Sequence, residues 1–324
     1  MSEATVKILI VDDDPHILDI VSEILSVSGD NEVTKALGGP AAKEILLCSG
    51  QLFDCFLLDI QMPTIDGIEL CKFIREQEVY SRTPILMLTA MSDKKHVDRS
   101  FAAGANDYIS KPFDFQELLA RIGTARRISE DAKKLQLLQQ QIQEDVPYHE
   151  GLPKPGLSEA LVLDDVANYL SVQTFENYTR QLNRGKFFSL SFLALQVVNI
   201  PEVYRRCTGI EFQHFVTDTA DAIANTLNSN EAFFTYRGHG IYLVAFNRIR
   251  NSFCEEFAHD VQVGLNGMEL RYRGGDPIYP LIRQSDIKNN GVFTKLGVLA
   301  AADAAVNDLH SQDKQPQFAR FLRA

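Results

Sequence analysis

The hydrophobic positions of the first 125 residues fall into short unbroken runs that alternate with helical patterns. Unbroken apolar runs predict buried strands at Val6–Val11, Cys55–Leu58 and Pro84–Thr89, with a shorter strand at Asp107–Ser110. Helical spacing of the apolar residues predicts helices at Ile17–Val27, Ile68–Ile74 and Val97–Ala103. Strands of this kind alternating with helices are typical of a doubly wound parallel α/β sheet, covered on both faces.

The pattern between residues 126 and 156 predicts a helical linker. Apolar residues recur at alternating steps of four and three from Ile128 to Val146, with polar Gln139 at one position, as in a dimerising coiled coil. The stretch is also rich in Lys and Gln, so a solvated helix that pairs with nothing stays open. Glycines and prolines from Pro147 onward break the helix.

Residues 157–324 predict a second domain, of the α+β class with a mainly antiparallel sheet. The apolar runs Ala232–Tyr236 and Ile241–Phe246 predict a hairpin joined by Arg237–Gly240. The other predicted strands lie at Phe187–Val198, Met268–Arg273 and Ile278–Ile282. The predicted helices lie at Phe175–Leu182, Phe212–Leu227, Phe253–Val263 and Leu296–Leu309.

Charge and hydropathy narrow the classes of partner. A net charge of -11 argues against broad binding of nucleic acid or anionic membranes, because phosphate contacts need Lys and Arg. No helix-turn-helix pattern or basic cluster is visible, so we expect no DNA partner. No apolar stretch approaches the roughly 18 to 20 residues that span a bilayer, and the chain starts with a strand pattern rather than a leader. We therefore expect a cytoplasmic protein with no membrane partner.

Polar residues with related chemistry stand at the carboxyl ends of the predicted strands. Asp12 and Asp13 close the first strand. Asp59 and Thr89 close two later ones, and Lys111 follows the last. Because strand ends meet at one edge of a parallel sheet, these residues should share a pocket. Neighbouring carboxylates repel one another unless a cation lies between them, and a hard ion held by few carboxylates fits Mg²⁺.

Such a pocket suits phosphoryl transfer, which needs mainly positioning and charge stabilisation. Asp59 would act as the nucleophile and form an acyl phosphate. Lys111 would pair with the phosphate oxygens, and Thr89 would donate a hydrogen bond to one of them. Any single aspartate here could be a solvated loop acid, but four elements that each end in the required residue favour the pocket.

These motifs resemble the receiver domain of two-component response regulators. Ile8–Pro15 is similar to the family's first strand and acidic pair, and Asp59–Gly67 to its phospho-acceptor loop. Leu88–Ala90 is similar to the switch strand, and Tyr108–Phe113 to the last strand with its loop. The resemblance covers residues 5–125. It implies a five-stranded parallel sheet and phosphorylation by a histidine kinase or a phosphotransfer protein.

The resemblance also implies roles for individual residues. Asp13, Asp59 and the backbone carbonyl of Gln61 would bind Mg²⁺, with Asp12 acting largely through water. The Lys111–Pro112 bond would be cis, which is chemically plausible only before proline.

A switch is implied as well. On phosphorylation Thr89 would move toward the phosphate, and Tyr108 would swing inward to fill the vacated space. That change would bias a face around the fourth helix and fifth strand that commonly dimerises in this family. A homodimer is therefore expected.

The second half resembles, less closely, a GGDEF (diguanylate cyclase) domain whose chemistry is lost. The family's glycine-rich acidic turn corresponds to Arg237, Gly238, His239 and Gly240, and its first metal-binding aspartate to Gln196. Cyclases hold two metal ions with carboxylates, so cyclase activity is not expected. The guanine-reading positions also differ, since they fall near Tyr204 and Arg205.

Two features of the second half keep alternatives open. Arg273–Asp276 resembles the lost turn, but Pro277 follows it, so a plain turn is favoured. His239 lies between two glycines and is either an exposed residue at a hairpin tip or a ligand in a nucleotide pocket.

Three functions follow from these observations. The first is a response regulator whose degenerate output domain binds an unknown downstream protein. The second is an effector that senses a nucleotide such as GTP or cyclic di-GMP without turning it over. The third, which the missing carboxylates disfavour, is an active diguanylate cyclase.

Overall fold

The structure is a computed structural model that describes residues 5–27, 31–89, 94–112, 114–127, 129, 154–184, 190–227, 232–247, 256–289 and 298–312. The chain divides into two compact units, Met1–Glu150 and Gly151–Ala324. The predicted coiled coil from Ile128 to Val146 lies, apart from Ser129, outside the described residues. The predicted domain limits at residues 125 and 156 stay predictions.

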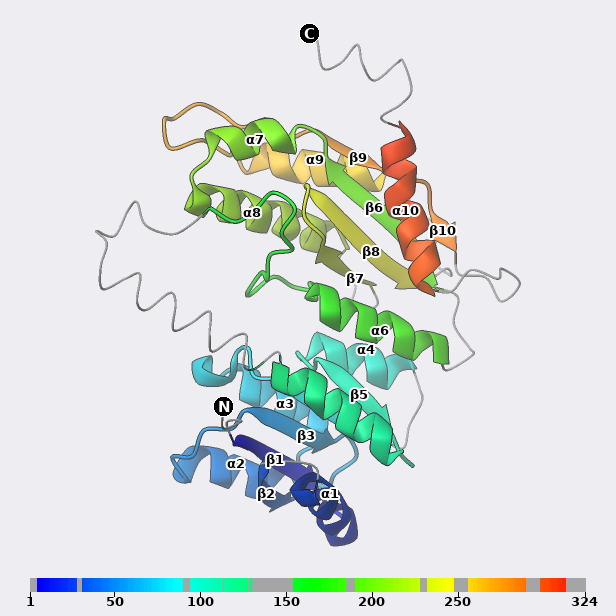
Figure 1. Ribbon diagram of the computed structural model, residues 1–324. Coiled ribbons are helices and arrows are strands. Elements are labelled where there is room, and N and C mark those ends of the chain that lie inside the picture. The colour runs from blue at the N-terminus through cyan, green and yellow to red at the C-terminus, as the bar shows by residue number, and fades with distance from the viewer. Residues whose placement is uncertain are drawn as a thin grey trace. The chain divides into compact units, whose positions relative to one another are not determined.

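The N-terminal unit contains a five-stranded parallel sheet with the order β2-β1-β3-β4-β5, which confirms the predicted fold class (Figure 1). Its strands are β1 (Val6–Asp12), β2 (Asn31–Leu37), β3 (Cys55–Asp59), β4 (Ile85–Thr89) and β5 (Asp107–Ser110). Every residue of β3 and β4 is buried, because helices cover both faces of the sheet. This burial explains the unbroken apolar runs of these strands.

The helices of this unit are α1 (Pro15–Val27), α2 (Gly39–Cys48), α3 (Gly67–Arg75), α4 (Lys94–Ala102) and a further helix over residues 115–127. A short 3-10 turn, η1, spans Glu78–Tyr80. On one face of the sheet, Leu18 of α1 and Leu118 of the last helix pack with Ile8 and Leu57. α2 and α3 lie against the other face (Figure 1).

The sequence pattern missed β2 and α2. β2 lies at the edge of the sheet, so three of its residues are only half-buried and three, Glu32, Lys35 and Leu37, are exposed. Its sequence therefore mixes polar and apolar residues and lacks the unbroken run of an inner strand. α2 begins at Gly39 with proline in its first turn and has few buried residues, which leaves it little apolar periodicity.

The C-terminal unit is built on an antiparallel sheet with the order β10-β6-β8-β7, and β9 also pairs with β6. Its strands are β6 (Leu190–Val197), β7 (Ala232–Tyr236), β8 (Ile241–Asn247), β9 (Ile282–Gln284) and β10 (Lys288–Asn289). The predicted hairpin is confirmed, with β7 and β8 joined at residues 237–240.

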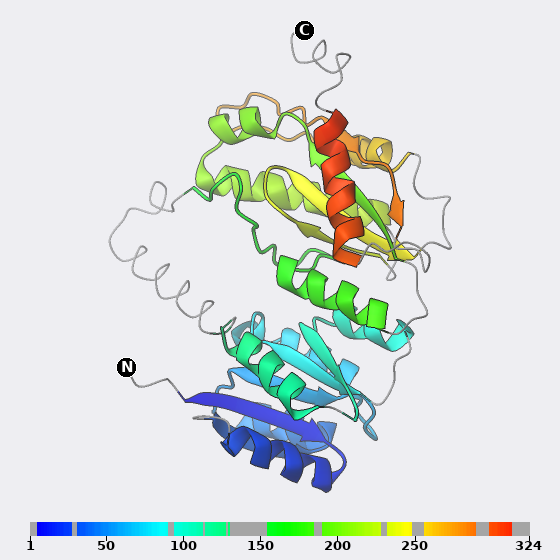
Figure 2. The ribbon, with the colours of Figure 1, turned by 45° about the vertical axis from the view of Figure 1, so that its right-hand side comes forward.

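The helices of the C-terminal unit are α6 (Val172–Arg184), α7 (Ile200–Arg206), α8 (Gly209–Leu227), α9 (Phe257–Gly267) and α10 (Val298–Gln312). Phe212 and Ile223 of α8 pack on one face of the sheet with Leu195 and Phe234. α6 and α10 lie on the other face, with α10 and α8 on opposite sides of the strands in Figure 2.

Two predicted strands of the C-terminal unit are wrong. Met268 follows the end of α9, and the predicted strand Met268–Arg273 is reduced to an isolated bridge between Arg271 and Pro277. β9 starts at Ile282, where the predicted strand Ile278–Ile282 ends. The intervening residues form a turn in which Gly275 N donates to Tyr272 O at 2.8 Å, so the predicted plain turn is confirmed. α7 was not predicted.

Among the described helices, none has both the length and the apolar character that crossing a bilayer requires.

Candidate functional site

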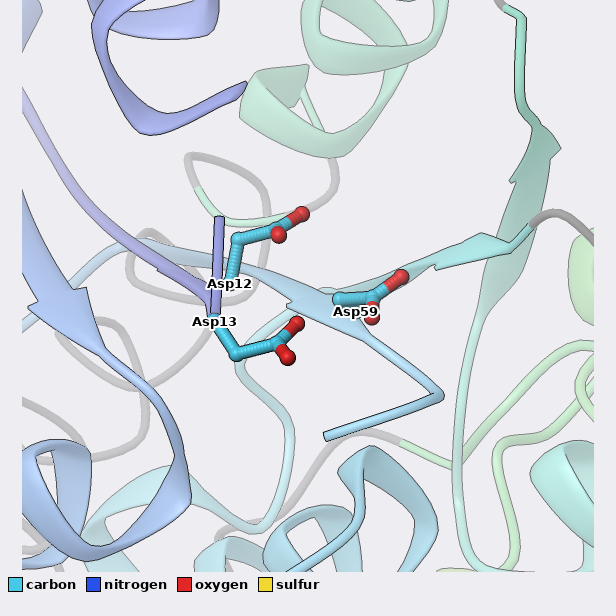
Figure 3. A group of neighbouring side chains, drawn as sticks. All are labelled: Asp12, Asp13 and Asp59. Carbon is cyan, nitrogen blue, oxygen red and sulfur yellow. The ribbon is translucent and has the colours of Figure 1, made fainter. Parts of the chain in front are cut away.

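Three carboxylates meet at the carboxyl edge of the N-terminal sheet. Asp12 is the last residue of β1, Asp13 follows it, and Asp59 is the last residue of β3. One oxygen of each lies within 4.8 Å of one oxygen of each of the others (Figure 3). Asp12 and Asp59 are buried, whereas Asp13 is exposed. The predicted acidic cluster is therefore assembled and reaches solvent through Asp13.

Lys111 supplies a cation to the two buried carboxylates. Its Nζ lies 2.6 Å from Asp12 Oδ2 and 2.8 Å from Asp59 Oδ1. The loop after β5 is held in place because Lys111 N donates to Thr89 O at 2.6 Å, at the end of β4. The sheet thus brings Lys111 to residues that are far away in the sequence.

The backbone around Asp59 is fixed from two sides. Ile60 N donates to Leu88 O at 3.0 Å, and Gly67 N donates to Ile60 O at 3.0 Å. A Cβ at position 67 would collide with the backbone oxygen of Asp59, so this position requires glycine. Asp66 caps α3, since its Oδ1 accepts from Glu69 N at 2.7 Å. The start of α3 therefore packs directly on the main chain of Asp59.

Burial and the neighbouring opposite charges have opposing effects on the pKa values of Asp59 and Lys111. Burial raises the pKa of Asp59, Lys111 acts against this, and the negative charges of Asp12 and Asp13 add to it. Burial lowers the pKa of Lys111, but its hydrogen bonds and ion pairs with Asp12 and Asp59 outweigh it, so the pKa is raised. The pocket therefore favours additional positive charge near Asp59.

The donor set of this pocket fits a hard divalent cation. Carboxylate oxygens are the ligands that Mg²⁺ prefers, and it commonly keeps several waters. Asp12 has both oxygens engaged, because Oδ1 accepts from Asp14 N at 3.0 Å and Oδ2 pairs with Lys111. This engagement agrees with an indirect role for Asp12, and it leaves Asp13 and Asp59 as the more available carboxylates.

The remaining predicted residues of this site lie in or shortly after β3, β4 and β5. Thr89 is fully buried at the end of β4, and Tyr108 of β5 is already buried, with 6% of its surface exposed. Gln61 follows β3 and is exposed. The Lys111–Pro112 peptide bond is cis, as expected. The roles of Thr89, Tyr108 and Gln61 stay predictions.

In the C-terminal unit, Gln196 lies beside an arginine rather than a carboxylate. Gln196 is in β6, opposite Ile241 of β8 and Arg283 of β9. Its Oε1 accepts from Arg283 Nε at 2.9 Å and from the second guanidinium nitrogen Nη2. A fixed cation thus stands beside Gln196, the residue predicted to replace a metal-binding aspartate.

The other predicted residues of the C-terminal unit share the β7–β8 turn. Gly238, His239 and Gly240 have φ values of 82°, 51° and 70°, so three successive residues are left-handed. His239 is exposed, which agrees with the first of its two predicted roles, a residue at the hairpin tip. Arg237 Nη1 pairs with Asp303 Oδ1 of α10 at 3.2 Å and lines a small cavity of about 90 Å³ between α6, α10 and the sheet.

Sequence reasoning missed three of these contacts. Gly67 carries no chemistry of its own, so only its place beside the acceptor loop marks it. Arg283 was missed because β9 was predicted at other residues. Asp303 was missed because no local pattern links α10 to the hairpin turn.

Comparison with known proteins identifies the N-terminal unit. Residues 8–123 match the response regulator receiver domain family. The regulator RpaA of Synechocystis sp., described as a DNA-binding dual master transcriptional regulator, is 37% identical over 139 residues. This match covers 41% of the chain and 56% of RpaA. The DNA-binding response regulator MtrA of Mycolicibacterium smegmatis is 34% identical over 143 residues, which cover 44% of the chain and 60% of MtrA.

Among solved structures, a response regulator structure from Chloroflexus aurantiacus J-10-fl is 38% identical. The similarity covers 38% of this chain and 99% of the other, with a TM-score of 0.35. The chain thus spans little more than half the length of the curated relatives described above.

Proposed function

We propose, because residues 8–123 are a response regulator receiver domain, that Asp59 takes a phosphoryl group from a histidine kinase or a phosphotransfer protein. One observation carries the proposal. Asp12, Asp13, Asp59 and Lys111 come from three separate strand ends and meet in one partly open pocket. Isolated loop acids have no reason to converge on one lysine in this way.

The chemistry follows from the roles of the side chains. A carboxylate oxygen of Asp59 attacks the phosphorus of the donor, the bond from phosphorus to the donor nitrogen breaks, and an acyl phosphate forms. Lys111 then shares its charge between Asp12 and the new phosphate oxygens, and Thr89 donates a hydrogen bond. Mg²⁺, held by Asp13, Asp59 and the carbonyl of Gln61, would offset the charge of the phosphoryl group.

We further propose that the C-terminal unit is a degenerate GGDEF-like domain that binds a protein instead of making a nucleotide. Support comes from the order of its elements, since β6, α7 and α8 precede the β7–β8 hairpin as in the resembled family. Support also comes from Gln196, His239 and Gly240, none of which has a carboxylate, at the positions of the family's acidic residues. A fold can persist after its chemistry is lost.

Dimerisation is the proposed route from phosphate to output. The phosphoryl group would draw Thr89 toward it and alter the packing of Tyr108, which biases the face around α4 and β5. Sedimentation with and without beryllofluoride, which mimics the phosphoryl group, tests this step. An unchanged mass and shape would contradict it.

The cellular setting is part of the same proposal. We propose a cytoplasmic protein, because donors of phosphoryl groups to such domains work there. RpaA and MtrA are DNA-binding by their names, yet each is matched over less than half of this chain. The net charge of -11 leads us to keep a protein target rather than DNA.

Acetyl phosphate with Mg²⁺ provides the direct test of Asp59. Intact-mass measurement should show one added phosphoryl group on the wild type and on the control Asp19→Asn, which changes an exposed aspartate of α1. Asp59→Asn should show none. Labelling of another residue, or labelling that survives in Asp59→Asn, would overturn the assignment.

Nucleotide sensing is the second candidate function, favoured by the exposed His239 at the tip of the hairpin turn. Calorimetry with GTP and with cyclic di-GMP decides between them. Micromolar binding would support the sensor. Production of cyclic di-GMP from GTP and Mg²⁺ would support an active cyclase and would contradict both the protein-binding domain and the non-catalytic sensor.

A further inference from the structure

Residues 154–159, which we call the strap, lie across the hairpin tip of the C-terminal unit without helix or strand structure. The strap precedes Leu161 and Leu163, which belong to the hydrophobic core of the unit. Its own residues are half-buried or exposed. The strap therefore lies on the surface, with one end fixed by the core.

A lysine anchors the N-terminal end of the strap to α7. Lys154 Nζ donates to Cys207 O at 2.5 Å and to Tyr204 O, and it lies 4.0 Å from the centre of the Tyr204 ring. These carbonyls end the helix and have no partner further along it. The ring adds a cation–π contact. Together they form a receptor for one ammonium group.

The hairpin tip holds the middle of the strap by its backbone. His239 N donates to Leu157 O at 2.6 Å. A Cβ at Gly238 would lie 2.5 Å from Ser158 O, so the two chains can pass this closely only at a glycine. The side chain of Leu157 packs against the hydrophobic core. The surface thus recognises a lysine and, three residues later, a leucine that lies in a tight turn.

The turn of the strap is formed by its own residues, and a few contacts, at Lys154 and Leu157, hold it on the unit. Gly156 N donates to Glu159 Oε2, and Glu159 N donates to Gly156 O, both at 2.9 Å, so the turn closes within the strap. Among the described residues, its backbone hydrogen bond to the rest of the unit is the one to His239. Segments with few buried contacts open at little free-energy cost.

We propose that the hairpin tip and the end of α7 form a peptide-docking surface, which the strap occupies in cis and vacates for a segment of a partner protein with the same lysine and leucine spacing. The chain's own segment defines the chemistry of that partner. The inference rests on the proposed protein-binding role of the C-terminal unit but not on phosphorylation of Asp59. The docking surface and the phosphorylation of Asp59 can therefore be disproved independently.

Competition with a synthetic peptide tests the proposal on the full chain. The probe is a fluorescent peptide with the sequence of residues 154–163. In the wild type the tethered strap outcompetes it through its high effective concentration. Lys154→Gln weakens the strap, so the peptide should bind this variant about tenfold more tightly than the wild type. A peptide with glutamine in place of the lysine should bind neither protein.

The matched control is Arg180→Gln, which removes one exposed positive charge from α6 and should behave as the wild type. Amide exchange gives a second readout. In Lys154→Gln the amide of His239 should exchange faster, while the strands β6 and β8 keep their protection. Equal peptide affinity for all three proteins, no binding to any, or faster exchange across the whole unit would overturn the proposal.

Discussion

The two sheet edges treat charge in opposite ways. At the carboxyl edge of the N-terminal sheet, Asp12, Asp13 and Asp59 gather negative charge that a single lysine balances only in part. At the hairpin edge of the C-terminal sheet, Gln196 accepts from a buried arginine, Arg283. The first edge keeps a demand for a cation, whereas the second has a built-in one. This difference is why we assign the proposed phosphoryl transfer to the first edge.

Removing Lys111 from the first edge should have the largest effect on stability. Lys111→Met leaves Asp12 and Asp59 buried without their cation, which should destabilise the N-terminal unit by about 3 to 5 kcal/mol. Protection of β1 and β3 in amide exchange measures the loss. Lys35→Met, which removes an exposed lysine paired with Asp19, is the control and should change little.

The same variant carries a pH signature. Burial holds the folded-state pKa of Asp59 above that of the unfolded chain, so its ionisation costs stability as the pH rises. The cost vanishes below the unfolded pKa of about 4. The deficit of Lys111→Met should therefore shrink as the pH is lowered toward that value. A deficit that grows on acidification would contradict the pairing described here.

Gly67→Ala tests whether the acceptor backbone depends on its neighbour. The added Cβ meets the Asp59 carbonyl, and this overpacking should cost about 2 to 3 kcal/mol and slow labelling by acetyl phosphate. Gly123→Ala is the matched control, because it lies in a helix with open space and should stabilise by about 0.5 to 1 kcal/mol. Equal effects of the two changes would rule out a special role for position 67.

At the second edge, Arg283→Met should cost less than the loss of Lys111. Its hydrogen-bond partner Gln196 is neutral, so we expect about 1 to 2 kcal/mol from the C-terminal unit. Amide exchange of β6 and β9 measures it. A loss as large as that of Lys111→Met would show that the two edges do not differ in the way argued.

Binding of magnesium should stabilise the N-terminal unit and not the C-terminal unit, and this is the smallest of the expected effects. At ten times its dissociation constant, an ion that binds only the folded state stabilises by about 1.4 kcal/mol. This gain should appear in β1 and β3 only, and Asp13→Asn should remove it. Equal protection of β6 and β8 would mean that the ion does not discriminate between the edges.

The inner strands and the acidic pocket could be predicted because each leaves a local mark in the sequence. β3 and β4 are buried at every residue, and the chemistry stands at their ends. β2 could not be found in this way, because an edge strand shares its residues with solvent. Strands as short as β10, with two residues, carry no period to detect.

The side-chain contacts of the C-terminal edge could not be predicted. Arg283 reaches Gln196 from 87 residues away, through a strand whose limits were misplaced. The Arg237–Asp303 pair joins a turn to a helix. Such contacts depend on how distant strands and helices pack together, which a single sequence does not reveal.

The close packing of Gly67 on the main chain of Asp59 limits how a conformational change caused by phosphorylation could spread from the pocket. Ile60 is tied both to β4 and to the start of α3, so the peptide chain at the acceptor has little room to shift. A phosphoryl group there meets an immobile support. On the proposed function, we therefore expect motion to start in side chains, first that of Lys111, which pairs with Asp59, and to continue to Thr89 at the end of β4.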